Sequence, residues 1–153
     1  MIDSLIKKYS RKRLSFYSHP KNQGRGAAVS LGIKKAQGRI VGYIDIDLEI
    51  PPDYMPLFIR EIEKKTDIAC GWRVYDFTFK SLPRWIASKG YNIIRNKALG
   101  ISIMDTEAGY KFFNRKKILP VLAKCKSPGW FWDTEIMVRS KIAGLKIAEV
   151  PVV

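Results

Sequence analysis

The feature that most constrains the fold is an apolar run that ends in alternating carboxylates. Residues 39–44 are typical of a buried strand, and a Pro-Pro pair at 51–52 breaks the chain soon after it. Between them stand three acidic residues at alternate positions: Asp45, Asp47 and Glu49. In an extended conformation all three side chains would point to one side, just beyond the carboxyl end of the strand. Hard oxygen ligands in that place suit Mg²⁺ or Mn²⁺, whereas the alternative is that the two aspartates cap the following turn.

The rest of the chain alternates strands with helices. Further strands are predicted at 67–71, 109–113 and 146–153, and residues 14–17 alternate like an edge strand. Helices are predicted at 27–36, 53–65, 82–99, 115–124 and 133–143, with glycine stops at Gly38, Gly100 and Gly144. This order predicts an α/β domain with a mostly parallel sheet. The chain has 153 residues, 46% of them hydrophobic, which fits one domain with a real core.

Charge and cysteine usage limit the partners and the compartment. The 28 Lys and Arg residues against 14 Asp and Glu give a net charge of +14, which indicates a polyanionic partner: nucleic acid, phosphorylated lipid, anionic membrane or nucleotide. No apolar run approaches the ~20 residues that span a bilayer, and the first residues do not resemble a signal peptide, so we expect a cytoplasmic protein. Cys70 and Cys125 lack the spacing of a zinc site and are expected to be reduced thiols.

Two residues beside predicted elements are candidates for chemistry. Arg25 stands in the polar turn ahead of the helix predicted at 27–36, where a cation and free backbone N–H groups would meet an anion. The alternative for Arg25 is a solvated turn residue. Asp105 comes shortly before the strand predicted at 109–113 and is either a functional carboxylate or an ordinary turn residue.

Two helical segments carry further polar candidates. Arg84, Ser88 and Lys89 lie near one face of the predicted helix at 82–99, and a solvated basic face is the alternative interpretation. Asp133 begins the helix predicted at 133–143 and suits an N-cap, and Glu135 follows it.

Three motifs, taken together and in order, point to a known family. They are Asn22-Gln-Gly-Arg-Gly-Ala-Ala28, Asp45-Ile-Asp-Leu-Glu49 and Asp105-Thr-Glu-Ala-Gly-Tyr-Lys-Phe-Phe113. The chain resembles glycosyltransferase family 2, most closely its dolichol-phosphate mannosyltransferase-like branch. The resemblance implies a GT-A-like (Rossmann-like) nucleotide-sugar transferase domain. It also implies an inverting transfer of mannose or glucose from a GDP- or UDP-linked donor to a polyprenyl or dolichyl phosphate at a membrane surface.

The resemblance also implies roles for individual residues. Asp45 and Asp47 would hold the donor and the metal, Mg²⁺ or Mn²⁺, and Glu49 would be a further metal ligand where the family usually has Gln. Arg25, where the family usually has Lys, would help to bind the donor. Asp105 would be the catalytic base or the charge that orients the acceptor phosphate. The acceptor side would include the residues Arg84, Ser88, Lys89 and Glu135.

The chain departs from the family pattern at its start. The family begins with an apolar strand and a P-x-[YF]-N-E segment long before the glycine-rich turn, which here lies at residue 22. We therefore expect residues 1–153 to be a single partial catalytic domain without its N-terminal strands, peripheral at the inner face of the membrane. Either the chain is a fragment of a longer enzyme, or a second polypeptide supplies those strands. The alternatives are a non-catalytic homologue that acts as a binding or assembly protein, and a basic nucleic-acid-binding module. Because the last explains only the charge, nucleic acid is not the expected partner.

Overall fold

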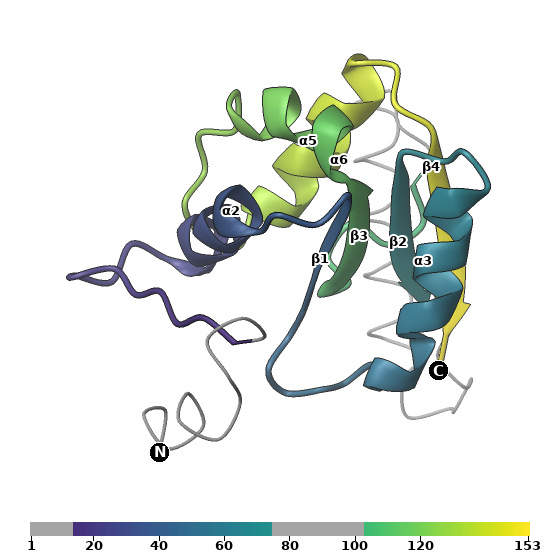
Figure 1. Cartoon of the computed structure of the whole chain (residues 1–153), viewed down its shortest axis with the longest axis horizontal. Helices are drawn as coiled ribbons and strands as arrows, with labels where there is room; N and C mark the ends of the chain where they lie inside the picture. Colours follow the sequence, from purple (N-terminus) through teal and green to yellow (C-terminus); the bar gives the residue numbers. More distant parts are fainter. Residues whose placement is uncertain (1–13, 75–102) are drawn as a thin grey trace, which may run out of the picture.

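A computed structural model of the chain describes residues 14–74 and 103–153 (Figure 1). The helix predicted at 82–99, with Arg84, Ser88 and Lys89, lies outside the described residues. The helices are α2 (Arg25–Lys35), α3 (Met55–Glu63), α5 (Arg115–Leu122) and α6 (Trp132–Ile142), with a short 3-10 turn η1 (Pro52–Tyr54) before α3. The strands are β1 (Ile40–Ile44), β2 (Ile68–Arg73), β3 (Tyr110–Asn114) and β4 (Ile147–Val152).

The four strands form one sheet in the order β1-β3-β2-β4. β2 and β4 are parallel, whereas β3 is antiparallel to both of its neighbours, β1 and β2. It follows that β1, β2 and β4 run in one direction and that β3 alone is reversed. The prediction of a mostly parallel sheet is correct in that three of the four described strands run in the same direction. Because the reversed strand lies inside the sheet, however, the only parallel pairing among the described strands is that of β2 with β4.

Both faces of the sheet are covered, as Figure 1 shows: α2, α5 and α6 lie on one side of it and α3 on the other. The alternation of side chains along β3 explains this. Phe113 packs into a core with Ile136 of α6, while its neighbour Phe112 packs with Phe58 of α3 on the opposite face. All of β3 except its last residue is buried, which is expected of a strand with strands on both edges and helices on both faces.

Two local predictions differ from the structure. Residues 14–17 form no strand, and Phe16 and Tyr17 are exposed, with the Tyr17 ring 5.4 Å from Lys35 Nζ. Helix α2 ends at Lys35, with Ala36 already extended, so Gly38 is not its stop. At the end of α6, in contrast, Gly144 adopts the left-handed φ of +72° that the sequence predicts for a helix stop.

Candidate functional site

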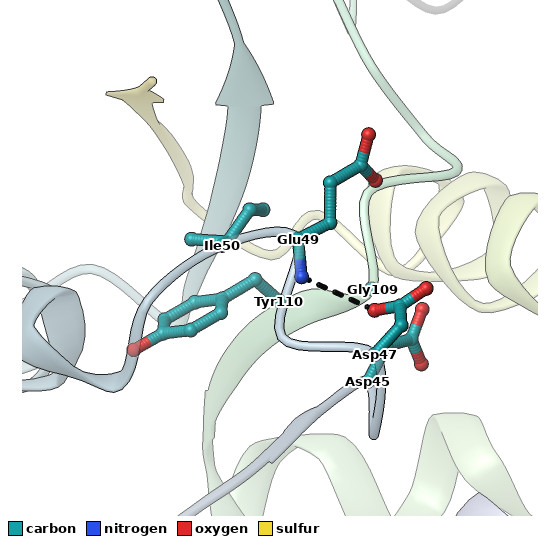
Figure 2. Close-up of a pocket in the computed structure, with 6 residues that line it drawn as sticks. All are labelled: Asp45, Asp47, Glu49, Ile50, Gly109 and Tyr110. Carbon is teal, nitrogen blue, oxygen red and sulfur yellow. Dashed lines mark hydrogen bonds between the residues drawn. The ribbon is translucent and has the colours of Figure 1, made fainter.

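The three predicted metal carboxylates follow β1, but in a turn rather than in an extended segment. β1 ends at Ile44, and the Leu48 N–H then donates to the Asp45 carbonyl at 3.2 Å. Leu48 also adopts a φ of +53°, which is uncommon for a leucine. The prediction that all three carboxylates point to one side is therefore wrong. Figure 2 shows the Glu49 side chain directed away from Asp45 and Asp47.

All three carboxylates nevertheless border one pocket at the carboxyl end of β1. Its lining consists of Asp45, Asp47, Glu49, Ile50, Gly109 and Tyr110 (Figure 2). Asp47 is exposed, and its Oδ1 accepts a hydrogen bond from the Glu49 N–H at 3.2 Å. The pocket thus contains an accessible carboxylate, Asp47, and is bounded on one side by Tyr110 of β3.

Gly109 determines how closely Asp45 can approach β3. The Asp45 N–H donates to the Gly109 carbonyl at 2.9 Å, and a Cβ at position 109 would lie 1.7 Å from Asp45 Oδ2. Any side chain there would displace the carboxylate. The glycine of the Gly-Tyr-Lys motif is therefore needed for the position of Asp45.

Arg25 joins the pocket to a buried carboxylate behind it. Arg25 is the first residue of α2, and its Nη2 and Nε lie 2.6 and 3.2 Å from Asp45 Oδ1. Its Nη1 forms an ion pair with Oδ2 of Asp133, a side chain that is only 3% exposed. Trp130 lies against the guanidinium, 5.3 Å from its ring centroid to Arg25 Cζ. One guanidinium thus bridges two carboxylates from different elements.

Two more side chains complete the surroundings of Asp133. Lys111 Nζ lies 2.9 Å from Asp133 Oδ1, the same oxygen that accepts a hydrogen bond from the Tyr43 hydroxyl. Burial raises the pKa of the Tyr43 hydroxyl, and Asp133 adds to the shift, so Tyr43 stays neutral and donates. Burial opposes the charge on Lys111, but the Asp133 carboxylate beside Nζ favours it, and the pKa of Lys111 is raised overall, so the fully buried lysine remains protonated.

A second ionic cluster lies where β2 ends. Arg73, the last residue of β2, contacts Asp105 Oδ2 through Nε at 2.8 Å and Asp105 Oδ1 through Nη2 at 3.3 Å. Its Nη1 lies 3.0 Å from Glu49 Oε2, which ties this cluster to the pocket. The backbone N–H groups of Glu107 and Ala108 also donate to Asp105 Oδ1, each at 3.0 Å.

These contacts decide the ionisation of Asp105. Burial alone would raise its pKa, but the hydrogen bonds and charge of Arg73, with the Glu107 N–H, lower the pKa overall. A carboxylate held in this way is a weak proton acceptor and a well-oriented negative charge.

Glu135 lies apart from both clusters. Its carboxylate accepts hydrogen bonds from the backbone of Lys126 and Ser127, the closest at 2.7 Å, and pairs with Arg139 on the next turn of α6. It holds the loop before α6 and does not line the pocket. Asp133 is not an N-cap either, because α6 begins at Trp132 and Asp133 is buried inside its first turn.

The structure therefore brings together most of the predicted site residues on the described part of the chain: Arg25, Asp45, Asp47, Glu49 and Asp105. Sequence analysis missed Tyr43, Arg73 and Lys111. A lysine within the apolar Tyr110–Asn114 strand was a usable signal, because a buried cation needs a buried anion. Nothing in the sequence indicated that this anion is Asp133.

The chemistry of the donors fits a divalent cation that is completed by a substrate. In the part of the chain that the structure describes, no three His, Cys, Asp or Glu side chains are grouped to hold an ion by themselves. Mg²⁺ and similar ions usually take one or two carboxylates and complete their shell with water and phosphate oxygens. Asp47, with Asp45 beside it, supplies that number of carboxylates, while Arg73 engages Glu49.

Comparison with known proteins identifies the chain's family. Residues 1–119 match the family described as Glycosyl transferase family 2. The chain belongs to glycosyltransferase family 2. The resemblance seen in the three sequence motifs is thereby confirmed.

Two curated relatives are similar over most of the chain. Glycosyltransferase AglD of Haloferax volcanii is 28% identical over 143 residues, which are 92% of this chain and 23% of that protein. Dolichyl-phosphate beta-glucosyltransferase ALG5A of Trichomonas vaginalis is 30% identical over 141 residues, which are 88% of this chain and 44% of that protein. The chain thus spans less than half the length of either relative.

Solved structures confirm the GT-A-like α/β fold. A mycobacterial protein is superposed with a TM-score of 0.65 at 21% identity, over 87% of this chain and 43% of that one. Glucosyl-3-phosphoglycerate synthase from Mycobacterium tuberculosis, in complex with Mn²⁺, UDP and glucosyl-3-phosphoglycerate, gives a TM-score of 0.62 at 15% identity, over 93% of this chain and 48% of that one.

Within the described residues of this family 2 chain, no helix is long and apolar enough to cross a membrane.

Replacing Gly109 with Ala should destabilise the protein by about 1–3 kcal/mol, because the new methyl group forces the Asp45 carboxylate away from Arg25. Urea unfolding measures this change. Gly32→Ala is the matched control, since nothing lies within 4 Å of that added methyl group and the helix should gain about 0.5–1 kcal/mol. Equal stability of Gly109→Ala and wild type would contradict the described approach of Asp45 to β3.

Replacing Arg73 with Gln should raise the pKa of Asp105, because the carboxylate loses its main counter-charge. A pH titration of the Asp105 carboxyl carbon by NMR measures the change. In the wild type, the stability that Asp105 contributes is present above its unfolded-state pKa and is lost as the pH falls through the lower folded-state pKa. An identical titration curve in Arg73→Gln would show that Arg73 does not set the charge of Asp105.

Proposed function

We propose that this chain forms part of the catalytic domain of an inverting glycosyltransferase that moves a hexose from a nucleotide-sugar to a polyprenyl or dolichyl phosphate. The observation that carries the proposal is the pocket at the carboxyl end of β1, bordered by Asp45, Asp47 and Glu49 in a family 2 chain. Ligands of open α/β sheets bind at that end of the strands. Residues 1–153 would belong to one such domain.

Glucose from a UDP-linked donor is the better supported sugar, and mannose from GDP the second choice. A dolichyl-phosphate beta-glucosyltransferase is among the relatives. A structural neighbour is described in complex with Mn²⁺ and UDP-glucose. These names support a hexose donor and a divalent cation, Mn²⁺ or Mg²⁺, but they belong to longer proteins than this chain.

On this proposal the chain's own residues bind and orient the donor diphosphate. Asp47 and Asp45 would hold the cation, which supplies positive charge beside the leaving diphosphate. Arg25, at the first turn of α2, would add a further cation on the donor side. Glu49 reaches Arg73 and would shape the boundary between the donor and acceptor sides.

Asp105 would orient the acceptor rather than take a proton from it. A phosphate acceptor is already anionic at neutral pH, so its oxygen can attack the anomeric carbon while the nucleoside diphosphate leaves from the other side. The lowered pKa of Asp105 suits this role because a carboxylate that stays ionised holds the Arg73 guanidinium in place. Arg84, Ser88 and Lys89 remain proposed acceptor contacts at the membrane surface, and Glu135 would act on that side only through the loop it holds.

The edge of β1 that no described strand pairs with offers the rest of the sheet a place to attach. Among the described strands, β1 pairs with β3 on one side only. A strand from another part of a longer polypeptide, or from a second chain, would extend the sheet there and cover the exposed edge. This arrangement agrees with the chain's span of less than half of each curated relative.

Asp47→Ala should abolish Mn²⁺-dependent binding of UDP-glucose to this chain, because the accessible carboxylate of the pocket is lost. Isothermal calorimetry with UDP-glucose and GDP-mannose, each with and without Mn²⁺, measures binding. Asp53→Ala is the matched control, since Asp53 is exposed in η1 and does not line the pocket. Binding that persists in Asp47→Ala, or a wild type that binds neither donor, would count against the proposed site.

A further inference from the structure

The buried carboxylate of Asp133 collects donors from three other elements. It accepts from Arg25 on α2, Tyr43 on β1 and Lys111 on β3, while its own backbone belongs to α6. Asp133 is 3% exposed and Lys111 is fully buried. No water-accessible partner is needed to satisfy this group, because both carboxylate oxygens are bonded within the protein.

The charges in this cluster are balanced. Arg25 and Lys111 are cationic and Asp45 and Asp133 are anionic, so the four groups sum to zero. Burying such pairs costs desolvation energy, and well-packed apolar residues of similar volume often give equal or greater stability. The fold alone therefore does not explain why a lysine and an aspartate occupy this interior.

The geometry connects this cluster to the pocket through Arg25. Its guanidinium uses Nη1 for Asp133 and Nε and Nη2 for Asp45, so the two carboxylates hold opposite parts of one rigid plane. Without Asp133, only the contacts of Nε and Nη2 with Asp45 Oδ1 would hold the guanidinium among these carboxylates. The Arg25 side chain is only 16% exposed, which leaves few other partners for it.

We propose that Asp133, Lys111 and Tyr43 form a buried positioning unit that fixes Arg25, and through Arg25 the Asp45 carboxylate, for binding the nucleotide-sugar diphosphate. This proposal rests on the proposed function of the pocket. Lys111 and Tyr43 hold Asp133 from β3 and β1, and Asp133 then holds Arg25. None of the three lines the pocket, and they act on it through Arg25.

A double-mutant cycle between Asp133→Asn and Arg25→Gln tests the unit, with calorimetric affinity for UDP-glucose in the presence of Mn²⁺ as the readout. Asp133→Asn should lower the affinity about tenfold, the effect of losing one charge-assisted hydrogen bond. Arg25→Gln, which loses its contacts with both Asp133 and Asp45, should lower it at least as much. In the Arg25→Gln background, Asp133→Asn should change the affinity less than about twofold, because Asp133 then has no arginine to position. A purely structural role predicts instead that the two losses multiply.

Arg115→Met is the matched control. Arg115 Nε donates to the Ala36 carbonyl at 2.7 Å, at the opposite end of α2 from Arg25, so its loss should lower stability without changing the affinity. If Asp133→Asn does not fold, Tyr43→Phe takes its place in the cycle, with an expected loss of about threefold from one hydrogen bond. Multiplying losses, or an unchanged affinity in the single variant, would overturn the positioning unit. A wild type without Mn²⁺-dependent binding would overturn the proposed function, and the positioning unit with it.

Discussion

The structure depends on one buried carboxylate, Asp133, and on the arginine that it shares with Asp45. Through Arg25, Tyr43 and Lys111 this carboxylate joins α2, β1, β3 and α6, which meet around one end of the sheet. Each of these contacts removes a charge or a hydroxyl from water, so each must be satisfied for the fold to be stable. The same contacts determine where Arg25 lies, and Arg25 determines the direction of the Asp45 carboxylate at the pocket.

The reversed strand β3 links this buried cluster to the candidate site at the end of the sheet. It lies between β1 and β2, so its first residues reach the end of the sheet where β1 and β2 finish. Gly109, just before it, allows Asp45 to approach, and Asp105 lies a few residues earlier against Arg73 at the end of β2. Two ionic clusters therefore lie at one end of the sheet, and Glu49 of the second and Asp45 of the first both line the pocket.

Much of the fold and of the candidate site was predictable from the sequence, and the features that were not have physical causes. Strands and helices on the described residues follow from their apolar periodicity, and the alternation of Phe112 and Phe113 accounts for cores on both faces. The direction of β3 was not predictable, because periodicity does not reveal which way a strand runs in its sheet. The turn after β1 was missed because Leu48 adopts a positive φ that its side chain disfavours. Lys111 could be recognised from the sequence as a charged residue in an apolar strand. Its partner Asp133, however, is distant in sequence and contacts it only in the folded chain.

The most direct test of the account is to locate the metal in solution. The chain, labelled with ¹⁵N and mixed with UDP, would be titrated with small amounts of Mn²⁺ while the broadening of each amide resonance is followed. The account predicts that Asp47, Gly109 and Tyr110, which border the pocket, broaden first, while Arg39 and Lys146 at the other end of the sheet stay sharp. Uniform broadening, or broadening centred away from the end of β1, would contradict it.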